Sequence, residues 1–191
     1  MAWLTEAQIE QLGFSKIGKN VYLSDKSSYY NCSNVEIGDN VRIDDFCVLS
    51  AGLGGIKIGR NVHVAVYCSL IGAGKITLED FSGLSSKVTI YSSNDDYSGE
   101  WMTNPTLPDE FTGVTYADVF IGKHTIIGSG SIILPGVTLE EGVAIGALSL
   151  VRKSCRAFTV HAGSPLKFIK NRKTRILDLE KEFLDLEQQD S

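Results

Sequence analysis

The sequence predicts an all-β solenoid, and three observations support this fold class. Ile, Leu or Val recurs every sixth residue through most of the chain, a small or β-branched residue usually follows four positions later, and Gly often stands directly after the aliphatic residue. A period of six matches neither the 3.6 residues of a helical turn nor the two-residue alternation of a hairpin strand. It is typical of a parallel β-solenoid, in which one aliphatic side chain per short strand points into a stacked core.

The six-residue period covers five blocks of the chain. Its seventeen aliphatic positions are Ile17, Leu23, Ile37, Ile43, Leu49, Ile58, Val64, Leu70, Leu78, Leu84, Ile90, Ile121, Ile127, Ile133, Leu139, Ile145 and Val151. Three periods make one triangular coil, so the solenoid is expected to span residues 15–156. Where Gly follows the aliphatic residue, as at Gly38, Gly59 and Gly128, we expect a tight corner that needs either a positive φ or the absence of a Cβ atom.

Three segments depart from the period. Thr5-Glu6-Ala7-Gln8 fits a helical capping box, which predicts a short N-terminal helix within residues 1–14. Ile90 and Ile121 stand 31 residues apart where six would suffice, so residues 92–118 form one long excursion, a place where repeat proteins put function. Residues 157–191 form a C-terminal tail and helix, whose role is open. The whole chain, 1–191, is expected to be a single domain.

Composition excludes several classes of protein. The formal net charge of −5 argues against nucleic acid as the main partner. There is no 18-residue apolar run and no basic stretch followed by an apolar one, so we expect no membrane insertion, no signal peptide and a cytoplasmic location. The four cysteines show no C-x-x-C spacing, and Cys47, Cys68 and Cys155 fall in the small inward slot, so we expect no metal site.

Three features together identify a family. They are the six-residue period, the block Ile121-Gly122-Lys123-His124-Thr125-Ile126-Ile127-Gly128 followed by Ile133-Leu134-Pro135-Gly136-Val137, and the closing Ala162-Gly163-Ser164-Pro165-Leu166-Lys167. The chain resembles the hexapeptide-repeat acyltransferases, in the branch of galactoside- and maltose-type and surface-polysaccharide sugar acetyltransferases. The resemblance implies a left-handed parallel β-helix, a homotrimer, acetyl-CoA as donor, and active sites in clefts between subunits.

Cations gather where the resemblance puts the donor. Coenzyme A is polyanionic at one end, and Lys and Arg hold phosphate groups best. This net acidic chain carries five cations within residues 167–175, after three others near the last coil. Matching motif to motif implies six donor-binding residues: Ser129, Ala147, Arg152, Lys153, Lys167 and Lys170. The cations after Lys170 have an alternative interpretation as a solvated basic tail.

The acceptor site departs from the family pattern. Similar sugar acetyltransferases carry a His in the long excursion, but none occurs in 92–118. His63 directly precedes the inward Val64, so its side chain should point outward, one coil before the excursion. In the family that face lines the sugar pocket. We predict His63 as general base, with substrate orientation as the alternative.

The excursion is acidic and aromatic. Asp95 and Asp96 are predicted to fix sugar hydroxyls or to hold the imidazole of His63 from a neighbouring subunit, since a carboxylate behind a His raises its basicity. Asn94, Tyr97 and Trp101 are predicted to bind the acceptor. The alternative is a solvated loop whose aromatics pack it down.

The predicted activity is acetyl-CoA-dependent O-acetylation of a saccharide or sugar nucleotide of surface-polysaccharide (O-antigen, capsule or lipopolysaccharide) biosynthesis. The alternative is N-acetylation of a nucleotide-linked amino sugar, because a free amine needs less help from a base than a hydroxyl does. A zinc carbonic anhydrase on the same scaffold would need three His ligands, and only His63, His124 and His161 exist. A purely structural solenoid is the remaining possibility. The residue patterns do not identify the acceptor sugar.

Overall fold

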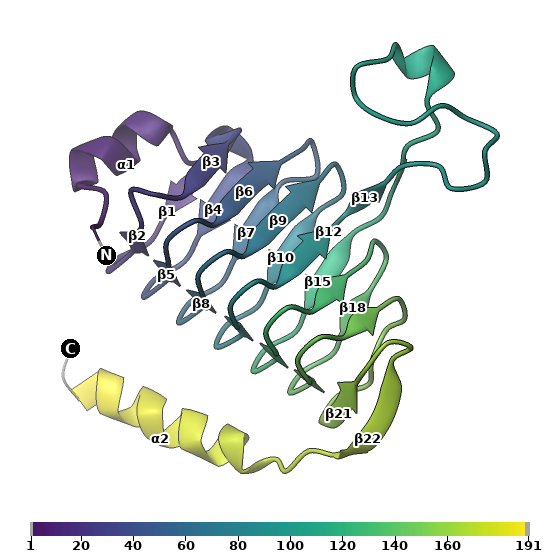
Figure 1. The fold of residues 1–191 in the computed structure, drawn as a ribbon. Helices are drawn as coiled ribbons and strands as arrows, with labels where there is room; N and C mark the ends of the chain where they lie inside the picture. The colour runs from purple at the N-terminus through teal and green to yellow at the C-terminus, as the bar shows by residue number, and fades with distance from the viewer. Residues whose placement is uncertain (1, 190–191) are drawn as a thin grey trace.

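Three parallel sheets wrap around one core to form a triangular prism (Figure 1). The computed structural model describes residues 2–189. Met1, Asp190 and Ser191, the outermost residues of the predicted segments 1–14 and 157–191, lie outside the described residues. The predicted fold class is confirmed: the chain is a left-handed parallel β-helix of about seven turns with a short N-terminal helix, one long excursion and a C-terminal helix.

Each sheet forms one face of the prism. The first face contains β1 (Lys16–Ile17), β4 (Val35–Ile37), β7 (Ile56–Ile58), β10 (Ile76–Leu78), β15 (Val119–Ile121) and β18 (Thr138–Leu139). The second face contains β2 (Tyr22–Leu23), β5 (Arg42–Ile43), β8 (His63–Val64), β11 (Gly83–Leu84), β16 (Ile126–Ile127), β19 (Ala144–Ile145), β21 (Thr159–Ala162) and β22 (Lys167–Asn171). The third face contains β3 (Ser28–Tyr30), β6 (Val48–Ala51), β9 (Ser69–Gly72), β12 (Thr89–Tyr91), β17 (Ile132–Ile133) and β20 (Leu150–Val151). Only β22 pairs antiparallel within these faces.

The remaining elements lie at the ends and in the excursion. Helix α1 (Glu6–Leu12) has the predicted capping box, with Thr5 and Gln8 each accepting a hydrogen bond from the other's backbone N–H. The excursion contains the short antiparallel pair β13 (Ser93–Asn94) and β14 (Thr115–Tyr116) and the 3-10 turn η2 (Asp109–Phe111). A second 3-10 turn, η1 (Cys32–Asn34), occupies a corner, and α2 (Arg175–Gln189) ends the chain.

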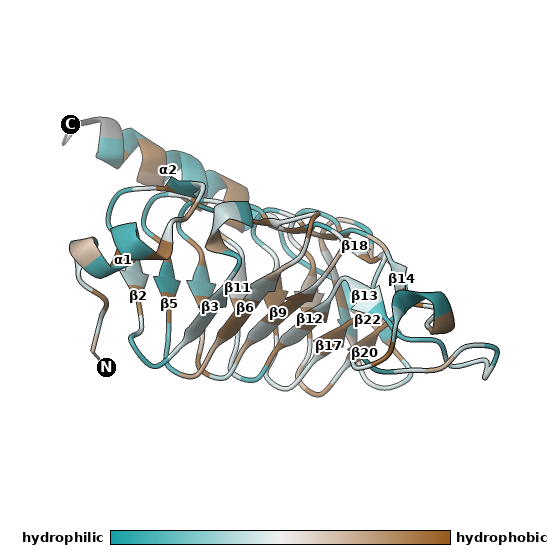
Figure 2. Ribbon diagram, turned by 90° about the horizontal axis from the view of Figure 1, so that it is seen from above, coloured by the Kyte–Doolittle hydropathy of each residue, from teal (hydrophilic) through white to brown (hydrophobic). Residues whose placement is uncertain are grey.

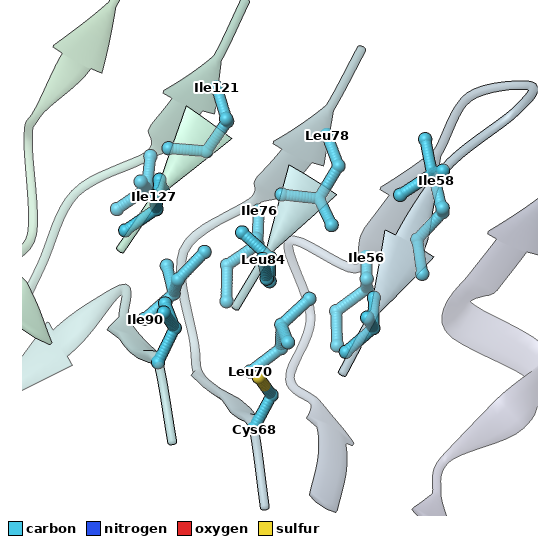
Figure 3. Close-up of a cluster of buried hydrophobic side chains, with 14 of the residues drawn as sticks. Ile56, Ile58, Cys68, Leu70, Ile76, Leu78, Leu84, Ile90, Ile121 and Ile127 are labelled. Carbon is cyan, nitrogen blue, oxygen red and sulfur yellow. The ribbon is translucent and has the colours of Figure 1, made fainter. Parts of the chain in front are cut away.

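The six-residue period marks the core. Sixteen of the seventeen predicted positions are buried, and Figure 3 shows Leu70, Leu84 and Ile90 among those that converge inside the prism. Figure 2 shows β6, β9 and β12 in hydrophobic colours, whereas much of α1 and α2 is hydrophilic. The exception is Ile17, whose side chain is 38% exposed. It belongs to the first coil, where β1 pairs with β4 alone and has no second neighbouring strand.

The glycines at the corners allow the backbones of neighbouring coils to approach each other closely. They do not adopt unusual dihedral angles. A Cβ atom on Gly38 would lie 2.8 Å from the carbonyl carbon of Gly59 in the next coil, and one on Gly128 would lie 2.5 Å from the amide nitrogen of Ala147. Neither glycine has a positive φ. The left-handed residue comes two positions later, as at Asn40 (φ 55°). Of the two alternatives predicted for these glycines, the missing Cβ is the one the structure uses.

Helix α2 folds back along one corner of the prism. Glu180 accepts hydrogen bonds from Lys123 at 2.5 Å and from Nε2 of the buried His124 at 2.8 Å, and Arg60 pairs with Glu187 near the end of the helix. Phe81 stacks on His124 and meets Phe183 edge-on. Neither helix among the described residues is long and apolar enough to cross a membrane.

Glu180 makes the docking of α2 sensitive to acid. Burial acts to raise the pKa of Glu180, but hydrogen bonds and charge from Lys123 and His124 outweigh it and hold the pKa below the ordinary 4.5. A depressed pKa in the folded state means that the stabilisation is full above pH 4.5 and is lost as the pH falls through the lower, folded value.

Glu180→Gln is therefore expected to weaken α2 docking at neutral pH by about 1.5 kcal/mol, because it leaves Lys123 and His124 without their carboxylate partner. Trypsin cleavage after the exposed Lys173 and Arg175 measures this, and should speed up about tenfold. Glu182→Gln removes the same charge from an exposed position of α2 and serves as control. Equal cleavage rates in the two variants would contradict the docking role.

Candidate acyl-transfer site

His63 projects from the outer surface of the second face. Strand β8 has two residues, and because side chains alternate across a strand, burial of Val64 turns His63 outward. Its neighbours in register are Arg42 of β5 and Gly83 of β11. The outward orientation predicted for His63 is the one observed.

A buried carboxylate from the preceding coil holds the imidazole. Oδ2 of Asp44 lies 2.9 Å from Nε2 of His63, and Oδ1 of Asp44 accepts a hydrogen bond from Nε of Arg42 at 2.7 Å. The Asp44 side chain is 7% exposed, against 51% for that of His63. An ionised carboxylate favours the tautomer with the proton on Nε2, which leaves the lone pair on Nδ1. This arrangement has the parts of a general base: an accessible ring nitrogen and a fixed carboxylate behind it.

His63 opens onto a groove that also contains a predicted donor residue. The groove has a volume of about 310 Å³ and is lined by His63, Ala65, Gly83, Leu84, Ser85, Ser86, Ile126 and Ser129. The structure thus brings together the predicted base and Ser129, which is predicted to bind the donor. Most of the lining side chains are small, so backbone groups of several coils are within reach of a ligand.

The predicted donor cations lie around two further grooves. Arg152 and Lys153 line a groove of about 660 Å³ with His161, whose pKa is lowered by burial, and Phe168 of β22. Lys170 lines a separate groove of about 460 Å³. Lys170 shares that groove with Val160, Asn171, Arg172, Lys173, Arg175 and Ile176.

The other two predicted donor residues are exposed. Lys167 opens β22 beside Leu166, which lines the larger groove, and Ala147 lies in the corner after β19. The side chain of Arg172 donates to the carbonyl oxygens of His124 and Gly142, so this cation is engaged by the fold. That contact favours a structural role for Arg172, which differs from the solvated basic tail of the alternative interpretation.

The predicted acceptor residues lie apart from His63 within one chain. The excursion leaves the prism after β12 on the third face and projects away from it, whereas β8 lies on the second face (Figure 1). Tyr97 is 88% exposed and Trp101 50% exposed, and Asn94 donates to the carbonyl of the exposed Asp95. None of these residues lines the groove of His63 within the described chain.

Asp96 has a local role. Its carboxylate accepts hydrogen bonds from Oγ of Ser98 and from the backbone N–H of Gly99, each at 2.8 Å. These bonds hold the pKa of Asp96 below its usual value. The side chain therefore stabilises a turn within the excursion.

Asp44 is the site residue that sequence reasoning missed. The carboxylate behind His63 was expected from Asp95 or Asp96 of another subunit, and the structure supplies it from the same chain. The signal was present in the period: Asp44 follows the core residue Ile43, and His63 precedes Val64, the equivalent core residue one coil later. In the described part of the chain, no group of three or more His, Cys, Asp or Glu is arranged to hold a metal ion.

Comparison with known proteins identifies the family. The family described as bacterial transferase hexapeptide (six repeats) matches residues 118–153. A dTDP-4-amino-4,6-dideoxy-D-glucose acyltransferase of Escherichia coli is 56% identical over 183 residues, which are 96% of this chain and 95% of the relative. WbbJ of Escherichia coli K12, described as a lipopolysaccharide biosynthesis O-acetyl transferase, is 30% identical over 81% of this chain and 79% of its own length.

A solved structure agrees over nearly the whole chain. AntD, an N-acyltransferase from Bacillus cereus in complex with dTDP and 3-hydroxybutyryl-CoA, superposes with a TM-score of 0.92 and is 41% identical, covering 97% of this chain and 98% of AntD. The predicted family and the predicted class of donor are both confirmed. The chain belongs to the hexapeptide-repeat acyltransferases and takes its acyl group from a CoA thioester.

Proposed function

We propose that this chain is a CoA-dependent N-acyltransferase of dTDP-4-amino-4,6-dideoxyglucose. The observation that carries the proposal is the 56% identity to an acyltransferase of that sugar nucleotide over almost the full length of both chains. It favours the predicted alternative, N-acylation, over the main prediction of O-acetylation, for which the likeness to WbbJ at 30% identity is the support.

The His63 groove fits the chemistry of amide formation. The amine nitrogen attacks the thioester carbonyl carbon, the N–C bond forms and the C–S bond breaks. Nδ1 of His63 takes the proton that the attacking nitrogen loses, and Asp44 stabilises the imidazolium that results. The proton then passes to the leaving thiolate of CoA, which departs as the thiol. The hydroxyl groups of the serines that line the groove, Ser85, Ser86 and Ser129, are the proposed donors to the oxyanion.

The complete site is proposed to form between subunits of a homotrimer. The excursion of one chain projects beyond its own prism, and His63 lies on a different face, so a neighbouring chain has to bring Asp95, Asn94, Tyr97 and Trp101 to the groove. In this arrangement Asp95 binds the acceptor amine or a sugar hydroxyl, and the aromatic residues stack on a ring. Light scattering of the purified protein measures the oligomeric state, and a stable monomer would contradict the proposal.

The donor is proposed to run from the cation grooves toward Ser129. Arg152, Lys153, Lys167 and Lys170 meet the phosphates, and the pantetheine arm passes Ala147. The proposed acceptor, an activated nucleotide sugar, supports a cytoplasmic reaction, and the likeness to WbbJ supports a route to a surface polysaccharide.

The direct test supplies matched acceptors. Purified enzyme is given acetyl-CoA with dTDP-4-amino-4,6-dideoxyglucose or with its 4-hydroxy counterpart, and thiol release and product mass are recorded. We expect an amide product from the amino sugar at a rate at least about 100-fold above that of the hydroxyl sugar, because the amine is the better nucleophile and the site is fitted to it. Faster ester formation on the hydroxyl sugar would instead support the O-acetyltransferase prediction.

Lys167→Ala is expected to weaken CoA binding about fivefold without changing the KM of the amino sugar, because an exposed ion contact contributes about 1 kcal/mol or less. Calorimetric titration with CoA at low and high salt measures the affinity, and the loss should shrink at high salt. Lys57→Ala on the first face removes the same charge away from the proposed donor path. An unchanged CoA affinity in the Lys167 variant would remove this residue from the donor site.

A further inference from the structure

Gly83 occupies a strand position that does not need a glycine. It lies on the outer surface of β11, and its φ is outside the left-handed region. A Cβ atom built on it would meet no atom within 4 Å, in contrast to the corner glycines, where a Cβ would strike backbone. Glycine inside a strand costs about 0.5–1 kcal/mol relative to alanine and often marks a place where a ligand approaches the backbone. Neither backbone nor packing within this chain accounts for Gly83, which leaves contact with a ligand or with a neighbouring subunit, and its place in the His63 groove favours the ligand.

The missing side chain leaves a notch at one place on the second face. Gly83 pairs in register with His63 on one side and with Ile126 on the other. Both neighbours are large and exposed, His63 with 51% of its side chain and Ile126 at 47%. The notch between them, lined by Gly83, opens into the 310 Å³ groove, where Ala65 and Ser85 add little bulk. Its walls therefore combine an apolar side chain with hydroxyl and imidazole groups.

The direction of the donor indicates what fills the notch. The donor residues Ser129 and Ala147 belong to later coils, and the proposed base belongs to the coil before Gly83. A thioester that reaches His63 from Ser129 has to cross the level of β11, so the substituent on its carbonyl carbon lies over Gly83. We infer that the Gly83 notch is the acyl-chain pocket and that it admits short acyl chains longer than acetyl, including one with a hydroxyl group. This inference rests on the proposed reaction centre at His63.

The test measures acyl-CoA affinity, which does not depend on the acceptor. Calorimetric dissociation constants for CoA, acetyl-CoA and 3-hydroxybutyryl-CoA are compared in the wild type, Gly83→Ala and Gly83→Val. We expect Gly83→Val, which adds three carbon atoms, to weaken 3-hydroxybutyryl-CoA binding about tenfold or more. Gly83→Ala, which adds one, should give a smaller loss, because small changes of bulk in an apolar pocket discriminate between ligands to this degree. The affinity for free CoA should stay within about twofold.

Controls separate this effect from damage to the fold. Gly83→Ala adds one atom in open space, so its melting temperature should match or exceed that of the wild type. Thr77→Ile adds bulk to the outer surface of β10 in the same coil, on the first face, and should leave all three affinities unchanged. Equal losses for CoA and 3-hydroxybutyryl-CoA, or no loss in either Gly83 variant, would overturn the inference. If the Gly83 variants lose affinity for 3-hydroxybutyryl-CoA as expected but the wild type does not acylate the amino sugar, the proposed function is refuted. The assignment of the Gly83 notch as acyl-chain pocket is then retained.

Discussion

His63→Ala is expected to lower kcat for the amino sugar by about 100- to 10,000-fold at neutral pH, the range that a positioned general base contributes. The dissociation constant for CoA should hardly change, because the cations proposed to bind the donor phosphates lie in other grooves. Steady-state turnover and calorimetric CoA binding measure the two quantities separately. The residual rate of the variant should rise with pH, since a free amine that forms at higher pH needs less help from a base.

Two companion variants sharpen this result. Asp44→Asn keeps the shape behind the imidazole but removes its charge, so kcat should fall less than in His63→Ala and the pH profile should shift. Lys57→Ala changes an exposed residue of the same coil on the first face and should leave turnover unchanged. Wild-type turnover in His63→Ala across the pH range would refute the base assignment and direct attention to Asp95.

Leu70→Ala is expected to lower the free energy of unfolding by about 2–5 kcal/mol, because it removes a fully buried side chain and leaves a cavity between coils. Urea unfolding, followed by circular dichroism at one fixed protein concentration, measures the change. The concentration has to be fixed because subunit association also contributes to stability.

Leu53→Ala is the matched control for this core substitution. Leu53 is 98% exposed in a corner, so the same chemical change should cost less than about 0.5 kcal/mol. A similar loss in both variants would mean that the six-residue period does not mark the core.

The scaffold could be predicted from the sequence because the same packing requirement recurs in every coil. One inward aliphatic residue per strand is required at every coil, and Leu23, Val64 and Ile133 are buried for the same reason. The prediction was wrong only for Ile17, at the open end of the stack. The sequence could not choose between a positive φ and a missing Cβ at Gly38, because contact with the next coil decides that question.

The site was harder to predict because it depends on contacts between residues in neighbouring coils. His63 and Asp44 are 19 residues apart, and they meet because β5 and β8 pair in register in neighbouring coils. The orientation of His63 followed from its place beside Val64, but its partner required the register between β5 and β8. Asp96 looked like a candidate partner in the sequence, and its bonds to Ser98 and Gly99 are purely local.

Helix α2 changes how a stacked chain of this kind resists unfolding. In a solenoid each coil contacts only its neighbours, so the end coils can fray without disturbing the rest. Here α2 follows the last coil yet contacts Arg60, Phe81 and His124, which belong to three earlier coils. Fraying from the C-terminal end therefore has to break contacts with the middle of the stack as well.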